Sequence, residues 1–401
     1  MARKLLCVII LLLLFNSNAF SQAKIGTVVE PHFSVFWDFY SSNDIGARVW
    51  AMGGAGVANV NNLTAMVINP AAMYFENRFQ IYYEGLNKSK IRWLEKIDPG
   101  MFLKSPQVLT TFTGLGYKIT EEVYTGLGYS SPRYYKLDLG MVYITTPGNP
   151  IPIGGTNPRT VLHHKQFIWQ INVYLGKGIF LGSNLNYNWI SADARGYYIY
   201  EPFYESKPCQ LKEESDADFV NFKFGALAEI HQILNFQGPG KINLGMVYTP
   251  KKYFEPKTEW KFGSHYKEFS LGEKTLPMKL ELGFKIYDLP IPLNFAGDVK
   301  YCDNSKIEYL IDRWDIHLGA EWEKSGNLAF QFGYFSRFDY RRGPDVGWLD
   351  EIGKYNQHFL TAGVRISLYD HLLQFSIRDS HLLSSGLIET TQISVGAGVG
   401  F

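Results

Sequence analysis

Apolar and polar residues alternate along most of this chain, and the alternation continues to its last residue. Val395, Val399 and Phe401 share one parity, whereas Ser394 and Gly398 share the other. Successive side chains of a β-strand point to opposite faces of a sheet. The pattern therefore predicts a strand with one face in an apolar medium and the other in a polar or tightly packed one.

Similar alternating segments follow one another from residue 78 onward. Short connectors alternate with long ones, as they do in transmembrane barrels with short turns at one end and long loops at the other. The pattern predicts an all-β fold, a transmembrane antiparallel β-barrel of about 14 strands. The expected strands are 78–87, 107–118, 122–146, 164–176, 179–200, 218–231, 241–262, 267–287, 291–303, 312–323, 327–340, 357–368, 371–379 and 389–401.

Charged residues within these segments indicate which face meets lipid. A Lys or Arg on the lipid side of a barrel costs about 2–4 kcal/mol at the bilayer midplane. The parity that carries the charges should therefore face the lumen. Residues expected to face the lumen include Arg365, Arg378, Glu281 and Asp298, and residues expected to face lipid include Ile393, Val395, Val399 and Phe401.

The first 21 residues have the pattern of a secretory signal peptide. Arg3 and Lys4 precede an apolar run over 5–15, and Ala19 and Ser21 supply small residues for cleavage. The run is about 11 residues long, whereas a helix needs about 20 to cross a bilayer. We expect cleavage after Ser21, or after residue 23, and a bacterial outer-membrane location for the mature chain.

Composition narrows the possible partners. The chain has 39 basic and 38 acidic residues, a formal net charge of +1, which gives no electrostatic case for a nucleic-acid partner. Its 26 Tyr and 28 Phe suit a barrel with aromatic girdles at the membrane interfaces. A secreted soluble β-sandwich or propeller would share this composition, but not the terminal strand or the long segments.

Two cysteines remain after signal cleavage. The alternation of connectors places both toward the external side, with Cys209 in the loop after 179–200 and Cys302 near the outer end of 291–303. An even pair in an oxidising compartment can form a disulfide, which is the slightly favoured interpretation. Two thiols are the alternative.

A glycine-rich segment precedes the first expected strand. Residues 52–58 read Met-Gly-Gly-Ala-Gly-Val-Ala, and Asn69-Pro70-Ala71 follows shortly before residue 78. This arrangement resembles the N-terminal plug of the FadL family, the outer-membrane transporters of long-chain fatty acids and aromatic hydrocarbons. The resemblance implies a signal peptide over 1–21, an N-terminal extension and plug over 22–77, and a barrel over 78–401, acting as a monomer without cofactor, metal or enzymatic activity.

A proline inside the expected strand 122–146 marks a second family feature. Proline lacks an N–H and cannot donate to a sheet ladder, so a bulge or interruption is expected at Ser131-Pro132. In the family, a kink in the third strand leaves a lateral hole beside the plug. The alternative is an ordinary loop. The residues expected at such an exit are Asn69, Pro70, Ala71, Tyr129, Ser131 and Pro132.

The family resemblance implies passive uptake of hydrophobic small molecules, which would be captured in external loops and released sideways into outer-membrane lipid. An apolar cluster in the first long loop is the expected capture site. Arg195 is the expected lumenal partner of a carboxylate head group. The cluster consists of Ile91, Trp93, Leu94, Met101, Phe102 and Leu103.

Other functional classes are also open. The PorV and PorQ components of type IX secretion resemble the same fold, so a shuttle or scaffold that binds secretion-system proteins is the main alternative. A dinucleotide loop at Gly54-x-Gly56 is disfavoured, because Asn59 stands where the third glycine belongs. The tandem His163-His164 has no third ligand at metal spacing.

Overall fold

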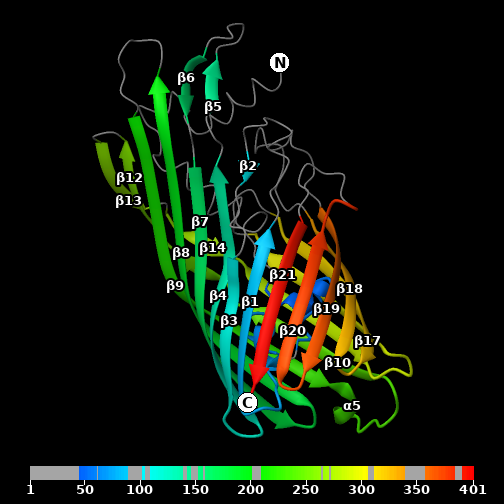
Figure 1. Ribbon diagram of the computed structural model, residues 1–401. Helices are drawn as coiled ribbons and strands as arrows, with labels where there is room; N and C mark the ends of the chain where they lie inside the picture. Colours follow the sequence, from blue (N-terminus) through cyan, green and yellow to red (C-terminus); the bar gives the residue numbers. More distant parts are fainter. Residues whose placement is uncertain are drawn as a thin grey trace.

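The computed structural model describes residues 45–60, 62–88, 102–103, 109–138, 142–145, 152–156, 159–200, 209–262, 265–270, 272–305, 311–338, 357–383 and 391–401 (Figure 1). Within these ranges, no helix combines the length and the apolar character that a membrane span would require.

Fourteen long strands of the described chain form one closed ring. Each is antiparallel to the next, and the last strand pairs with the first, so that Gln80 lies opposite Gly400 and Lys88 opposite Gln392. The all-β fold and the barrel of about 14 strands are thereby confirmed. The strands are β1 (Phe79–Lys88), β3 (Leu109–Lys118), β4 (Val123–Asp138), β7 (Arg159–Gly176), β8 (Ile179–Tyr200), β9 (Cys209–Glu229), β10 (Lys241–Thr249), β15 (Met278–Tyr287), β16 (Leu293–Asp303), β17 (Arg313–Ser325), β18 (Leu328–Arg337), β19 (Gln357–Leu368), β20 (His371–Asp379) and β21 (Thr391–Gly400).

Shorter elements extend the ring. The tall strands β8 and β9 rise above the remaining wall with a two-stranded extension attached to β9 (Figure 1). A small helix lies at the opposite end, near the C-terminus of the chain. The short elements are β2 (Phe102–Leu103), β5 (Val142–Thr145), β6 (Pro152–Thr156), α5 (Ile230–Ile233), β11 (Lys252–Phe254), β12 (Lys257–Phe262), β13 (His265–Ser270) and β14 (Lys274–Leu276).

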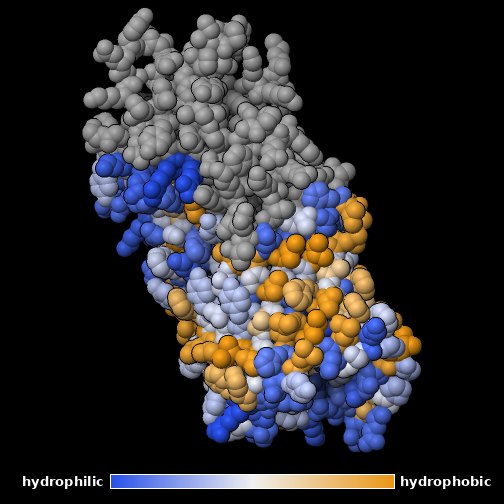
Figure 2. Space-filling view, in the orientation of Figure 1, coloured by the Kyte–Doolittle hydropathy of each residue, from blue (hydrophilic) through white to orange (hydrophobic). Residues whose placement is uncertain are grey.

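The two faces of the wall differ as the alternation predicts. Ile393, Val395 and Phe401 are 46%, 42% and 66% exposed on the outer face, where apolar side chains gather in a band across the visible wall (Figure 2). Arg378 and Asp298 are only 1% and 2% exposed and lie on the inner face. The register expected for lipid-facing and lumen-facing residues is therefore confirmed.

Cys302 lies near the end of its strand as expected, whereas the position of Cys209 and the absence of a disulfide differ from expectation. Cys209 begins strand β9 instead of lying in a loop, because the chain resumes its extended course there and pairs with Tyr198. Cys302 is a buried thiol near the end of β16, and its Sγ contacts the side-chain oxygen of Asn304 at 3.5 Å. The expected disulfide is absent.

Two expected strands are divided. The segment 241–262 consists of β10, β11 and β12, and the segment 267–287 consists of β13, β14 and β15. By contrast, β4 runs through Ser131 and Pro132 as one strand, with a bulge against β7. Of the bulge or interruption expected at Ser131-Pro132, the structure shows the bulge.

Candidate functional site in the barrel lumen

The described residues before β1 lie inside the ring (Figure 1). This inner segment, residues 45–60 and 62–78, contains α3 (Ala47–Ala51) and two 3-10 turns, η2 (Leu63–Met66) and η3 (Pro70–Ala72). Its apolar side chains are buried and form a cluster with wall residues such as Phe112. The segment therefore has a packed core of its own against the barrel wall.

Glu84 of β1 holds the start of the inner segment. Its carboxylate accepts hydrogen bonds from the backbone N–H groups of Gly46, at 2.9 Å, and Ala47, at 2.8 Å. These are unsatisfied donors at the N-terminus of α3, where a negative charge is favourable. A charged residue that the sequence pattern places in the lumen thus serves as an anchor.

Asp298 of β16 makes an equivalent contact further along. Its Oδ2 accepts from the backbone N–H groups of Gly56, at 2.7 Å, and Val57, at 3.0 Å. Both donors belong to the glycine-rich sequence that prompted the plug comparison. The bend of this sequence presents successive N–H groups to one carboxylate, an arrangement that favours an anion.

Arg48 and Glu321 form a buried ion pair between α3 and β17. The Nη2 of Arg48 lies 2.8 Å from Oε1 of Glu321, and its Nε lies 3.0 Å from Oε2. Nη1 donates to the carbonyl of Asn59 at 2.6 Å, and Gln331 donates to Glu321 at 2.6 Å. Burial opposes the charge on Arg48, but the Glu321 carboxylate outweighs it and raises the pKa of the guanidinium.

The Asn-Pro-Ala sequence rests on β7, β8 and β9. Asn69 caps η3 by accepting from the N–H of Ala71 at 3.0 Å, and its Nδ2 donates to the carbonyl of Ala226 at 3.2 Å. Asn172 donates to the carbonyls of Ala71, at 3.1 Å, and Met73, at 2.8 Å. These contacts fix the last turn of the inner segment before β1.

Glycines in the wall allow the inner segment to approach its backbone. A Cβ added at Gly182 would overlap the carbonyl of Pro70, and one at Gly333 would overlap the backbone of Gly53. The sequence does contain a signal for this contact that our sequence analysis missed. The signal is a glycine in the middle of a strand at a position whose side chain would face the lumen. Other wall glycines in contact with the inner segment are Gly116, Gly126, Gly225, Gly245, Gly283, Gly319 and Gly363.

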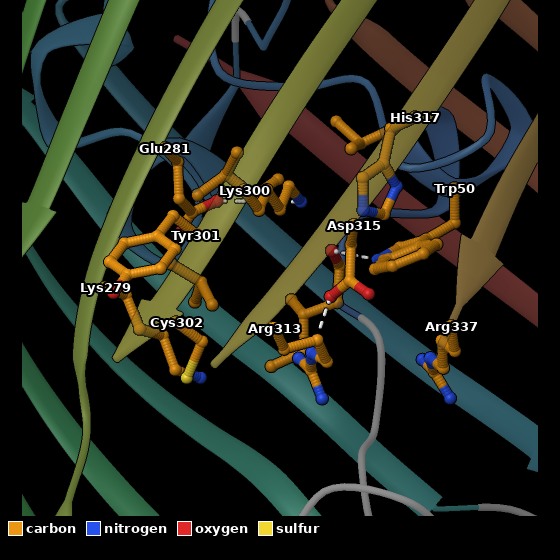
Figure 3. A pocket seen from close by; sticks show the side chains of 14 residues that line it. Trp50, Lys279, Glu281, Lys300, Tyr301, Cys302, Arg313, Asp315, His317 and Arg337 are labelled. Atoms are coloured by element: carbon orange, nitrogen blue, oxygen red, sulfur yellow. Dashed lines mark hydrogen bonds and ion pairs between the residues drawn. The ribbon is translucent and has the colours of Figure 1, made fainter. Parts of the chain in front are cut away.

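A cavity of about 230 Å³ remains between the inner segment and strands β15 to β18 (Figure 3). One wall is apolar and comes from the inner segment, whereas the other is polar and comes from the barrel. The apolar residues are Ile45, Val49, Trp50, Val67 and Ile68, and the polar wall consists of Lys279, Glu281, Lys300, Tyr301, Cys302, Arg313, Asp315, His317 and Arg337.

Basic side chains outnumber acidic ones around this cavity. Lys300 lies 3.6 Å from Glu281, and Nε of Arg313 lies 2.8 Å from Asp315. Lys279 and Arg337 add two further positive charges to the lining. The arrangement can accommodate a molecule with an apolar body and an anionic group.

On its β3 side, β4 has no ladder partner at residues 131–136 among the described residues, and β2 then pairs with Leu137 and Asp138. Ladder pairing between β3 and β4 ends where Phe112 faces Ser130, and β4 then shifts register against β7 before Arg133. Ser131 is buried, and its hydroxyl contacts the carbonyl of His164 at 3.4 Å. Tyr129 packs edge-on against Phe167.

The Asn-Pro-Ala turn and the β4 bulge contact the same strand, β7. Gln170 donates to the carbonyl of Pro70, and Gln166, four residues earlier on β7, faces Ser130 beside the bulge. Four residues along a strand correspond to about 13 Å.

The remaining predicted site residues have different outcomes. Arg195 lies on the outer face of β8, exposed, with Asp193 at 2.5 Å and Glu214 at 3.5 Å, so it does not face the lumen as expected. Arg195 lies an even number of residues from the exposed Trp189, so both side chains point outward, whereas Asn184, Asn186 and Asn188 point inward. Ile91, Trp93, Leu94 and Met101 fall outside the described residues, and only the backbone of Phe102 and Leu103 is described, within β2.

Several solved transporter structures resemble this structure across about nine-tenths of its length. The toluene transporter TbuX of Ralstonia pickettii superposes with a TM-score of 0.60 at 12% identity, covering 89% of this chain and 98% of that one. The toluene transporter TodX of Pseudomonas putida gives 0.58 at 12% identity, covering 90% and 98%. A FadL homologue of Pseudomonas aeruginosa gives 0.58 at 11% identity, covering 92% and 99%.

No protein-family model matches the chain, and no curated protein matches its sequence. The structural likeness accordingly defines the fold: a closed barrel of the FadL-like type. This agrees with the resemblance that the glycine-rich segment and the Asn-Pro-Ala sequence indicate.

Proposed function

We propose that the protein is an outer-membrane channel for the passive entry of hydrophobic small molecules. The observation that carries the proposal is the combination of a lipid-facing closed barrel with a lumen filled by an anchored inner segment, which leaves a cavity with one apolar wall. The solved structures with this fold include toluene transporters and a FadL homologue. The described residues contain no cluster of His, Cys, Asp and Glu that could hold a metal ion.

The inner segment favours sideways release over straight passage. Glu84, Asp298 and the Arg48–Glu321 pair attach it to β1, β16 and β17. A solute that crosses the lumen would have to displace all three attachments to leave along the barrel axis. An apolar solute would instead leave through the wall at residues 131–136 of β4, which have no ladder partner on the β3 side, into lipid that dissolves it readily.

The cavity suggests the chemical class of the solute. Its apolar wall would hold a hydrocarbon body, and its basic residues would attract an anionic end. Capture at the external loop residues 91–103 and release near Ser131-Pro132 remain part of the proposal. The secretion-scaffold alternative has no support from the cavity or from the structural comparisons.

Uptake of an anionic amphiphile against a neutral one tests this proposal. In cells that express the barrel, we expect Arg337→Gln to slow dodecanoate entry by about tenfold while leaving toluene entry nearly unchanged, because only the anion uses the guanidinium. Lys324→Gln, which lies outside the cavity, is the matched control. Entry rates that do not depend on the barrel for either solute would reject the channel.

A further inference from the structure

The wall has an unpaired stretch between β9 and the strand that follows it. Ladder pairing from β10 ends where Tyr248 faces Phe224, and it resumes in β12 where Lys257 faces Asp216. Between these points, residues 217–223 and 249–256 are described on both sides, yet no ladder pair joins them. Two hydrogen-bonded regions thus enclose a window in the wall.

The sequence of the second side explains the window. Pro250 and Pro256 stand at its two ends, and neither can donate a backbone hydrogen bond. Residues 252–254 keep a partner on their other side, where β11 pairs with β14 and Lys252 faces Leu276. The hairpin therefore continues intact while its contact with β9 is lost.

Two stacked aromatic rings, one from each side, lie at the window. Phe219 and Phe254 lie with their ring centroids 4.7 Å apart and their planes at 25°, and both side chains are buried. The outward neighbours Val220, Phe222 and Tyr253 are exposed. The window therefore borders apolar wall on its outer side and has an apolar closure.

The inner side of the window adjoins the lumenal cavity. Thr249, at the lower margin, faces Lys279, which lines the cavity. Lys223, at the same margin on β9, donates through Nζ to the carbonyl of Val67, another lining residue. A molecule that passes the two phenylalanines would enter next to the apolar wall of the cavity.

We propose that this window is a lateral entry from the outer leaflet, with Phe219 and Phe254 as its gate. A hydrophobic molecule dissolved in that leaflet would separate the two rings and reach the cavity. Opening would break no ladder hydrogen bond, because none joins the two sides. The proposal rests on the channel function and adds a second route, distinct from the β4 bulge.

Thiol access from lipid tests the gate. In a Cys209→Ser, Cys302→Ser background, Phe254→Cys is exposed to N-(1-pyrenyl)maleimide dissolved in the membrane. The matched control is Phe359→Cys, whose native ring is also buried and is stacked on Phe335 at 4.4 Å, but in a seam where those two residues pair directly. We expect the window thiol to react about tenfold faster, because thiol reactivity follows access.

Two outcomes overturn the proposal. Equal rates at positions 254 and 359 would mean that the window is closed to lipid. Faster reaction of Phe254→Cys with a charged, membrane-impermeant maleimide than with the pyrenyl reagent would mean that the position is reached from water. Phe219→Cys repeats the measurement from the β9 side if the first variant fails to fold.

A reversible cross-link between the two gate positions tests whether the gate controls uptake. In the same background, Phe219→Cys/Phe254→Cys is joined by oxidation or by a short bis-thiosulfonate, and uptake of 1-N-phenylnaphthylamine is followed. We expect bridging to slow uptake by about fivefold and reduction to restore it, since an apolar constriction controls passage. Unchanged uptake that still requires the barrel would reject the window alone, whereas uptake independent of the barrel would reject the channel function itself.

Discussion

Arg48 and Glu321 place two opposite charges where water does not reach them. Their side chains are 5% and 0% exposed, and each has further partners in the lumen. A buried pair of this kind gives little net stability, but the loss of one partner leaves a buried charge uncompensated. The pair therefore specifies where α3 sits on the wall.

Glu321→Gln should release the inner segment from the wall. Arg48 would keep its charge without the carboxylate, at a cost of about 3–5 kcal/mol. Protease cleavage within residues 45–78 of the folded protein measures the effect. Glu323→Gln is the control, because this partly exposed partner of Arg365 should contribute no more than about 1 kcal/mol. Equal protection in both variants would contradict an anchoring role.

Gly53 tests the close approach of two backbones. Its φ is 67°, and an added Cβ would meet the backbone of Tyr334. Gly53→Ala should therefore cost about 1–3 kcal/mol in backbone strain and shift the inner segment. Gly326→Ala, where an added Cβ meets nothing within 4 Å, should leave thermal unfolding unchanged. Similar unfolding temperatures for the two variants would argue against the contact.

Among the elements, alternation predicts a strand only where one face is apolar. The bounds of β8 match the expected segment 179–200, because apolar outward residues continue along most of it. The start of β9 was missed, because Lys212 to Asp216 are polar on both faces, although the strand extends to Cys209. The part of a strand that extends beyond the lipid is in contact with water on its outer side, so an apolar outer face is not needed there.

The candidate site was less predictable than the strands. The cavity joins the inner segment to residues of β15 to β18, and nothing in the local sequence shows which lumen-facing charges will meet there. The apolar cluster within residues 91–103 was predicted because apolar residues are unusual in an external loop. Lys279 and Arg337 have no such distinguishing feature in the sequence, because many charged residues face the lumen. Pro250 and Pro256 do indicate an unpaired edge in the sequence, because a proline, like Pro132, cannot donate a hydrogen bond to a neighbouring strand.

Replacing residues 130–134 by a regular alternating strand should restore pairing of β4 with β3. Pro132 would no longer remove a donor, so the wall would close beyond Ser130. Uptake of a hydrophobic probe should then fall, while membrane insertion remains intact. Heat-modified gel mobility reports insertion. Undiminished uptake through a wall whose closure is structurally confirmed would contradict release at this bulge.

The whole molecule combines two opposite surfaces on one wall. Its outer face meets lipid with exposed apolar side chains, and its inner face meets a buried, polar and charged lumen. The two-residue period of the strand produces both surfaces from one chain. A one-residue slip would exchange them, which is why the register is so strongly determined.

The seam between β1 and β21 has a consequence for assembly. The inner segment directly precedes β1, and its anchors belong to strands distributed around the ring. Its contacts with Asp298 and Glu321 need β16 and β17 to be in place, although the segment itself leads into the first strand of the ring. The segment can therefore be fully anchored only late in assembly, after most of the wall has been synthesised.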